Sequence, residues 1–230
     1  MTNITNNWHQ VQNDVHNHAL QCGRNPEDII ILAVSKTHST AIISEGIKAG
    51  IQYFGENYAQ EFRDKYSEIS LLPIQQPSWH FIGHIQTNKV KYIVPFCSLI
   101  HTVDSVRLAE EIGKISQKNN RKTSILLQIN TSGELSKSGI APNDVHDIVE
   151  KIQMIDGISI EGLMCIPAPE EENAIREEFR LLYELKNTLI QKYPHHSWHH
   201  LSMGMSSDYH IAIEEGATII RIGTAIFGLR

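Results

Sequence analysis

Short apolar runs rich in β-branched residues recur eight times along the chain, and stretches with helical periodicity separate them. This alternation is typical of βα units, in which helices connect parallel strands. Eight strands in 230 residues predict an α/β fold, a single closed (β/α)₈ TIM barrel in which residues 1–230 form one domain. An open doubly wound sheet with fewer strands is the alternative. The predicted strands are Ile29–Ser35, Ile51–Gly55, Trp79–Gly83, Leu99–Val103, Ser124–Asn130, Ile158–Cys165, His199–Gly204 and Thr218–Gly223.

Apolar residues spaced three and four apart predict amphipathic helices between these strands. The clearest stripes run over Val106–Ile115, Val145–Ile152 and Ile175–Leu189. A further helix over residues 4–22 precedes the first strand, and we expect it to pack outside or under the barrel. Glycines follow several helical stretches where a left-handed residue is expected. They are Gly50, Gly157 and Gly216.

Composition limits the partners of the protein. The formal net charge of −6 argues against nucleic acid, because a duplex binder needs a concentrated basic surface. No apolar run approaches the roughly 20 residues that span a bilayer, and residues 1–12 do not resemble a signal peptide. The cysteines Cys22, Cys97 and Cys165 are widely spaced and form no CxxC pair, so we expect reduced thiols in a cytoplasmic protein without a membrane partner.

Lys36 directly follows the first predicted strand, Ile29–Ser35. In a barrel of this kind, functional residues gather at the carboxyl ends of the strands. Partial desolvation there favours the neutral amine, which is the form that attacks a carbonyl carbon. The alternative is a lysine that only extends from a strand end to solvent.

The segments after the seventh and eighth strands carry the features of a phosphate site. Residues 206–208 (Ser-Ser-Asp) can cap a helix, and Gly223 lets the backbone approach an anion beside the hydroxyl of Thr224. Barrels often bind phosphate at this position. Two ordinary capped turns are the alternative. Together with Lys36, these segments favour a Schiff-base amine beside a phosphate site.

Six motifs carry a more specific signal in their order along the chain. They are Ala33–Thr37 (AVSKT), Phe54–Tyr58 (FGENY), Trp79–Lys89 (WHFIGHIQTNK), Ser136–Gly139 (SKSG), Leu201–Ser206 (LSMGMS) and Arg221–Gly228 (RIGTAIFG). Together they resemble the YggS/PROSC family of pyridoxal phosphate homeostasis proteins. The barrel of that family is similar to the N-terminal domain of bacterial alanine racemase, the fold type III of enzymes that use pyridoxal 5′-phosphate (PLP).

The resemblance implies PLP as the cofactor, seven residues around it and no catalytic residue. Lys36 matches the Schiff-base lysine, and Arg221 matches the arginine placed near the pyridine nitrogen. A salt bridge beneath the loop is the alternative role of Arg221. The positions that match phosphate-binding segments are Ser206, Gly223 and Thr224, and the positions close to the cofactor are Asn57 and Met164.

Racemisation on PLP normally requires a second base opposite the lysine, which alanine racemase takes from a tyrosine of a C-terminal domain. We expect no such domain here, because only seven residues follow Gly223. Tyr58 and Tyr209 fall near strand ends, but no sequence pattern places either opposite Lys36. The expected function is therefore a non-catalytic carrier that holds PLP and delivers it to apo-enzymes. A fold type III racemase or lyase and a cofactor-free class I aldolase are the alternatives.

Several polar residues have no role assigned from sequence. They are His80, His84, Lys89 and Lys137. The candidates for holding the cofactor in passing are Lys89, Lys137 and, more remotely, Lys91, although a solvated surface charge explains each as well. Four further histidines, His195, His196, His199 and His200, precede or begin the seventh strand, at the amino end of the barrel. We therefore expect no metal site, and a lone barrel predicts a monomer.

Overall fold

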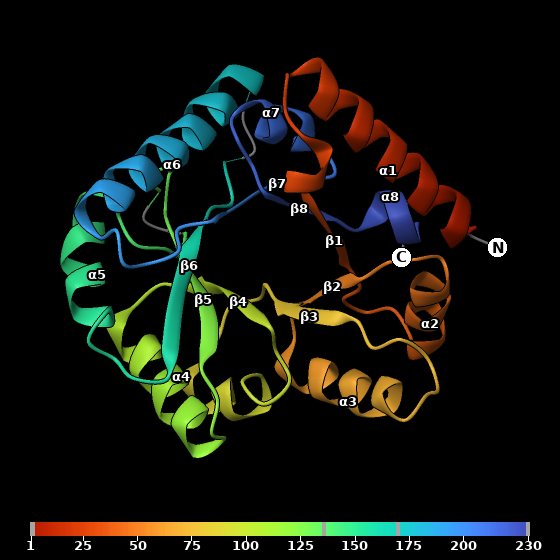
Figure 1. The fold of residues 1–230 in the computed structure, drawn as a ribbon, viewed down its shortest axis with the longest axis horizontal. Helices are drawn as coiled ribbons and strands as arrows, with labels where there is room; N and C mark the ends of the chain where they lie inside the picture. The colour runs from red at the N-terminus through yellow and green to blue at the C-terminus, as the bar shows by residue number, and fades with distance from the viewer. Residues whose placement is uncertain (1–2, 135–136, 169–170, 229–230) are drawn as a thin grey trace.

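The computed structural model describes residues 3–134, 137–168 and 171–228. Within them, eight parallel strands pair in sequence order, and β1 pairs with β8 to close a barrel. Figure 1 shows the helices as an outer ring around these strands. The strands are β1 (Ile30–Val34), β2 (Tyr53–Glu56), β3 (Ser78–Phe81), β4 (Leu99–Val103), β5 (Thr123–Gln128), β6 (Ile158–Met164), β7 (His200–Met205) and β8 (Ile219–Ile222).

The α-helices occupy the connections predicted from periodicity, and short 3₁₀ helices supplement them. None of the helices in the described parts of the chain combines the length and the apolar character that crossing a membrane requires. The α-helices are α1 (Ile4–Gln21), α2 (Thr40–Lys48), α3 (Ala59–Ser70), α4 (Val106–Lys118), α5 (Val145–Ile152), α6 (Glu172–Lys192), α7 (Tyr209–Glu214) and α8 (Thr224–Phe227). The 3₁₀ helices are η1 (Pro26–Asp28), η2 (Thr87–Tyr92) and η3 (Pro142–Asp144).

The closed barrel confirms the predicted α/β fold and excludes the open sheet. Each predicted strand overlaps an observed one, and Gly50, Gly157 and Gly216 have the positive φ angles expected after helices. One connection differs: β3 and β4 are joined by the 3₁₀ helix η2 instead of a full α-helix. Pro95 follows shortly after η2, and proline cannot continue a helix because it lacks an N–H.

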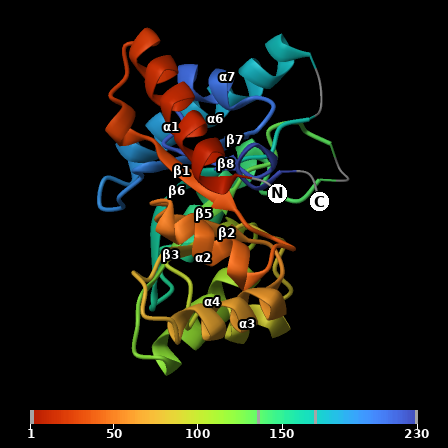
Figure 2. The same cartoon turned by 90° about the vertical axis from the view of Figure 1, so that its right-hand side faces the viewer.

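The predicted N-terminal helix is also confirmed. The Asn3 side chain caps α1 by accepting from the Asn6 amide at 3.0 Å. The buried residues of α1 recur at helical spacing and face the barrel; they are Ile4, Trp8, Val11, Val15 and Ala19. Figure 2 shows α1, α2 and α3 following one another down one side of the molecule. The Asn7 side chain donates to the Ile226 carbonyl at 3.0 Å, which ties α1 to α8.

The barrel interior has its own apolar cluster, separate from the larger core between strands and helices. Its buried members come from strands all around the barrel, so only the interior can bring them together; they are Leu32, Leu99, Leu126, Met164 and Ile219. Gly55 provides room for this cluster, because a Cβ there would lie 3.1 Å from Leu32 Cδ2 and 3.2 Å from Ile82 Cδ1. Since side chains alternate along a strand, residues of the same parity face inward.

Candidate functional site

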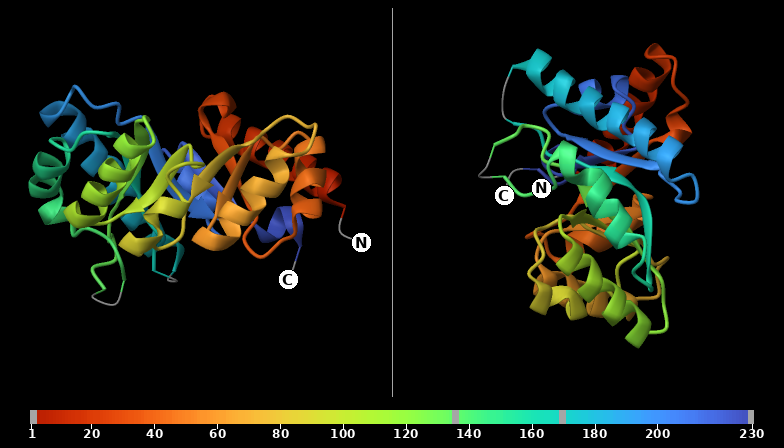
Figure 3. Two further views of the ribbon diagram at one scale, coloured as in Figure 1. Left: turned by 90° about the horizontal axis from the view of Figure 1, so that it is seen from below. Right: turned by 90° about the vertical axis from the view of Figure 1, so that its left-hand side faces the viewer.

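The predicted site residues continue the inward-facing positions of their strands. Lys36 has the parity of Leu32, Asn57 that of Gly55, and Gly223 that of Ile219. All three follow the carboxyl ends of their strands. In the left panel of Figure 3, α8 and the loop after β5 lie on the same, lower side of the barrel, which is this carboxyl side.

Strands β1 and β8 bring the segment that leads to Lys36 beside Gly223. Ala33 pairs with Ile222, so the next residues, Val34 and Gly223, also lie side by side. A Cβ at position 223 would lie 3.5 Å from Val34 Cβ, in ordinary contact. Lys36, two residues beyond Val34, is half-buried. The β1 end and the start of α8 therefore form one edge of the barrel mouth.

A buried polar network holds the segment that carries Lys36. Ser35 Oγ donates to Glu56 Oε1 at 2.6 Å, and Lys65 Nζ donates to the same oxygen at 2.7 Å. Lys65 also donates to the Ser35 carbonyl at 2.7 Å and to Glu61 Oε1 at 2.6 Å. Burial raises the pKa of the fully buried Glu56, and the Lys65 ammonium opposes that rise. Sequence analysis missed Lys65 and Glu61, although their i, i+4 spacing on α3 was visible.

Thr37 fixes the other flank of Lys36. Its φ of +67° is in the left-handed region, which a β-branched residue rarely adopts. The Thr37 amide donates to Glu61 Oε1, the oxygen that also accepts from Lys65. Lys36 thus lies between Ser35 and Thr37, which the same hydrogen-bond network holds. The network therefore fixes the backbone position of Lys36.

Asn57 has an unsatisfied polar atom at the mouth. Its Oδ1 is buried and has no hydrogen-bond partner among the described residues. Gly83 packs directly on the Asn57 backbone, because a Cβ at position 83 would lie 2.0 Å from the Asn57 carbonyl oxygen. A buried acceptor without a donor is costly, and a bound polar ligand would satisfy it.

The segment after β7 differs in detail from the predicted helix cap. Asp208 is the N-cap of α7, but its side chain accepts from the Met205 amide at 2.6 Å and not from the helix. The first N–H groups of α7 consequently lack a side-chain cap. The Ser206 side chain is exposed beside them. Gly204, with φ +90°, permits this close turn, since a Cβ there would lie 2.6 Å from Ala212 Cβ.

A second short helix starts at the same mouth. Gly223 is the N-cap of α8, has no side chain to cap it, and precedes the exposed Thr224. The His38 ring, from the loop that follows Lys36, lies 5.0 Å from the Phe227 ring of α8. Two uncapped helix starts with hydroxyls beside them suit an oxyanion.

Arg221 and Met164 lie deeper, inside the barrel. Arg221 is only 4% exposed, and its Nη1 donates to Ser202 Oγ at 2.8 Å. Its Nη2 donates to the Cys165 carbonyl at 2.9 Å. A salt bridge beneath the loop, the alternative role for Arg221, is not among its contacts in the described chain. Met164 is fully buried in the interior cluster.

The remaining candidates lie less centrally. His84 is exposed, and Lys89 Nζ lies 5.9 Å from the Tyr92 ring centroid. Lys137 Nζ pairs with Glu134 Oε1 at 3.3 Å, while Ser136 of the same motif is outside the described residues. Tyr58 is 54% exposed, and the Tyr209 ring packs against His210 at 3.9 Å.

The histidine-rich segment before β7 lies at the amino end of the strands, as predicted. His199 and His200 line a hollow there with Ile30 and Thr218, which begin or precede β1 and β8. Burial lowers the pKa of His200. This hollow of about 880 Å³ is therefore on the side of the barrel opposite to Lys36.

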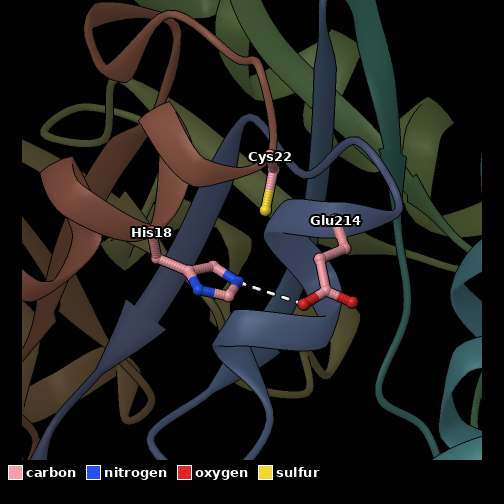
Figure 4. A group of neighbouring side chains, drawn as sticks. All are labelled: His18, Cys22 and Glu214. Carbon is pink, nitrogen blue, oxygen red and sulfur yellow. Dashed lines mark ion pairs between the residues drawn. The ribbon is translucent and has the colours of Figure 1, made fainter.

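One group of possible metal ligands occurs among the described residues, and sequence analysis did not identify it. It joins His18 of α1 and Cys22, the C-cap residue of α1, to Glu214 at the end of α7 (Figure 4). Glu214 Oε1 lies 3.2 Å from His18 Nε2, and Glu214 Oε2 lies 2.6 Å from Arg176 Nη1. These ion pairs account for the carboxylate without a metal ion.

Relatives of known identity resemble the chain over its length. Residues 2–230 match the alanine racemase N-terminal domain. The pyridoxal phosphate homeostasis protein of Escherichia coli K12 is 39% identical over 231 residues, covering 100% of this chain and 98% of the relative. The chain belongs to the pyridoxal phosphate homeostasis protein family. Its Aquifex aeolicus member is 42% identical, with 91% of each chain covered.

Solved structures agree with this family membership. PipY of Synechococcus elongatus, solved with PLP bound, superposes with a TM-score of 0.81 at 34% identity, covering 93% of this chain and all of PipY. Alanine racemase of Clostridium difficile superposes with a TM-score of 0.69 at 16% identity and shares the barrel fold. This chain covers only 59% of that racemase.

Proposed function

We propose that this protein binds PLP as a Schiff base on Lys36 and serves PLP homeostasis by holding the cofactor and delivering it to apo-enzymes. The observation that carries the proposal is the convergence of Lys36, Asn57, Gly223 and Ser206 on the carboxyl mouth of the barrel. Further support comes from PipY, a relative solved with PLP bound.

The residues at the mouth match the chemical groups of PLP. The cofactor supplies an aldehyde, which a lysine amine converts to a Schiff base with loss of water. The amine of Lys36 would bond to the aldehyde carbon of PLP. The uncapped start of α8, with Gly223 and Thr224, would bind the phosphate. Ser206 would add a hydroxyl to the phosphate site. The unpartnered Asn57 Oδ1 is consistent with a polar group in this space.

Arg221 and Met164 complete the proposed site from below. A guanidinium only donates hydrogen bonds, so Arg221 facing the pyridine nitrogen would hold that nitrogen unprotonated. This weakens the ability of the cofactor to stabilise a carbanion, which favours storage over catalysis. Met164 would support the ring from the apolar interior.

We further propose that the protein is not an enzyme. A racemase needs a second base opposite the lysine, and neither candidate tyrosine suits that role. Tyr58 is exposed outside the first turn of α3, and the Tyr209 ring is engaged with His210. Catalysed exchange of the α-proton of an added amino acid would contradict this part of the proposal.

The visible spectrum of the purified protein with PLP tests the proposal. Wild type should show the yellow Schiff-base band, and Lys36→Ala should lose it, while Lys89→Ala should retain it as the matched control. Delivery is tested by adding the loaded protein to a PLP-free apo-enzyme. Reactivation no faster than with free PLP would refute the delivery role.

The proposal also comprises a monomer with one domain over residues 1–230 and a cytoplasmic location. Reduced cysteines are typical of that compartment, and Cys22, Cys97 and Cys165 are free thiols. Light scattering at several protein concentrations tests the monomer. A mass that corresponds to a dimer would refute it.

A further inference from the structure

A line of four hydrogen-bonding side chains crosses the interior of the barrel. His80 Nδ1 lies 3.0 Å from His101 Nε2, and His101 Nδ1 lies 2.8 Å from Ser202 Oγ. Ser202 Oγ accepts from Arg221 Nη1 at 2.8 Å. The four residues come from β3, β4, β7 and β8, and each is at most 4% exposed. No step of the proposed cofactor chemistry uses His80, His101 or Ser202.

The donor and acceptor of each bond follow from the arginine at one end. A guanidinium has no acceptor, so Arg221 must donate to Ser202 Oγ. Ser202 has one hydroxyl proton, and His101 Nδ1 is its remaining partner in the described chain. If Ser202 donates to Nδ1, the His101 proton is on Nε2. His101 Nε2–H then donates to His80 Nδ1, which leaves the His80 proton on Nε2 as well.

Burial makes the neutral form of both imidazoles dominant. It lowers the pKa of His80 to about 3 and lowers the pKa of His101 well below its ordinary value. The charged and titratable groups around the pair are Arg221 and His200, with the Tyr53 ring edge-on to His80 at 5.8 Å. The cation and the second imidazole both oppose protonation, so both rings stay neutral and the direction of the hydrogen bonds selects their tautomers.

We propose that His80, His101 and Ser202 are positioning residues that orient Arg221 toward the ligand at the barrel mouth. This inference rests on the proposed binding of PLP. In the described chain, the hydrogen-bond partners of Arg221 are neutral, Ser202 Oγ and the Cys165 carbonyl. Asp208 acts on Arg221 only through space, without an ion pair between them in the described chain, so the guanidinium keeps its positive charge for the ligand. Because every acceptor in the line is neutral, the line orients the guanidinium without cancelling that charge.

Nitrogen-15 NMR of the imidazoles in the PLP-free protein tests the line itself. We expect both histidines as Nε2–H tautomers with Nδ1 accepting, and we expect these shifts to stay constant as the pH falls from about 7.5 to about 5.5. An Nδ1–H tautomer on His101, or titration near the ordinary histidine pKa, would overturn the proposed direction. This readout does not depend on cofactor binding.

Variants test the positioning role with PLP present. Ser202→Ala removes the acceptor of Arg221 and should weaken PLP binding about tenfold, since a hydrogen bond to a charged group is lost. It should also make the visible band pH-dependent, because a displaced arginine no longer opposes protonation of the pyridine nitrogen. Ser202→Thr keeps the hydroxyl and should restore both properties.

His101 provides a second pair of variants. His101→Asn preserves an acceptor near the Nδ1 position, whereas His101→Leu removes it, so only the leucine variant should reproduce the pH-dependent band. A pH-independent band and unchanged affinity in both Ser202→Ala and His101→Leu would overturn the positioning role. Failure of the wild type to bind PLP would instead refute the proposed function, and the tautomer measurement would still decide whether the line exists.

Discussion

Replacing Lys65 by methionine should destabilise the protein more than any surface substitution. Lys65 Nζ is the only cation hydrogen-bonded to Glu56 in the described chain, and both side chains are buried, with relative exposures of 7% and 0%. Lys65→Met leaves the buried Glu56 carboxylate without a counter-cation, and the Ser35 hydroxyl is then its one hydrogen-bond donor in the described chain. Removing one partner of such a pair costs about 3–5 kcal/mol of unfolding free energy.

A double variant distinguishes this cause from loss of packing. In Glu56→Gln/Lys65→Met the charge is gone, and the Gln carbonyl still accepts from Ser35 Oγ. The remaining losses are the bonds from Lys65 to the Ser35 carbonyl and to Glu61 Oε1, together about 2 kcal/mol. The double variant should therefore be about 1–3 kcal/mol more stable than Lys65→Met alone, because the packing that both variants lose cancels from the comparison.

Urea denaturation followed by circular dichroism measures these differences. Lys114→Met is the matched control, because Lys114 is 76% exposed and 3.8 Å from Glu111, and it should change stability by less than about 0.5 kcal/mol. A double variant no more stable than Lys65→Met would refute the reasoning. In that case the methylene packing of Lys65, and not its charge, would hold the Lys36 segment.

Three further predictions concern stability and thiol chemistry. His80 and His101 are neutral in the fold but take up protons when unfolded, so the unfolding free energy should fall by about 2 kcal/mol between about pH 6 and pH 5, and His101→Leu should reduce that slope. Gly204→Ala should lower the unfolding free energy by about 2–4 kcal/mol in urea denaturation, because position 204 has a φ of +90° and an added Cβ would contact α7. The matched control is Gly133→Ala, at a position with φ +72° and open space around it, which should cost only about 1–2 kcal/mol. A thiol reagent should modify Cys22 in the native protein and all three cysteines after denaturation. The reason is that Cys97 and Cys165 are buried, which raises the pKa of each thiol to about 12. Rapid reaction of all three thiols in the native state would contradict this prediction.

The pH prediction depends on the direction of the shift. A histidine whose pKa falls on folding contributes stability that is fully present above its unfolded pKa near 6.5 and is lost as the pH falls toward about 3. Stability should therefore rise with pH across the acid range. A flat profile from about pH 6 to pH 5 would show that these imidazoles are protonated in the fold.

The barrel was predictable because its signal is local. Each strand is a short apolar run, and each helix repeats its apolar residues at a fixed spacing, so Leu99–Val103 was predicted with its observed bounds. The end of a strand then identifies mouth positions such as Lys36 and Gly223. Their neighbourhood follows from the order and register of the parallel strands.

Contacts between residues distant in sequence were not predictable in this way. Ser35 is hydrogen-bonded to Lys65, which lies 30 positions away in the sequence, and His101 to Ser202, which lies 101 positions away. Nothing in the apolar run around His101 indicates a polar partner. The cap after β7 differed for a related reason, since the Asp208 carboxylate can reach either the helix or Met205, and the sequence does not determine which.

The position of the Schiff base tests the central proposal most directly. Borohydride reduces a Schiff base to a stable secondary amine, so mass spectrometry of peptides from the reduced PLP-loaded protein locates the modified lysine. We predict one pyridoxyl adduct, on Lys36, and its absence from Lys36→Ala treated in parallel. An adduct on Lys89 or Lys137 in the wild type with Lys36 unmodified would contradict the assignment.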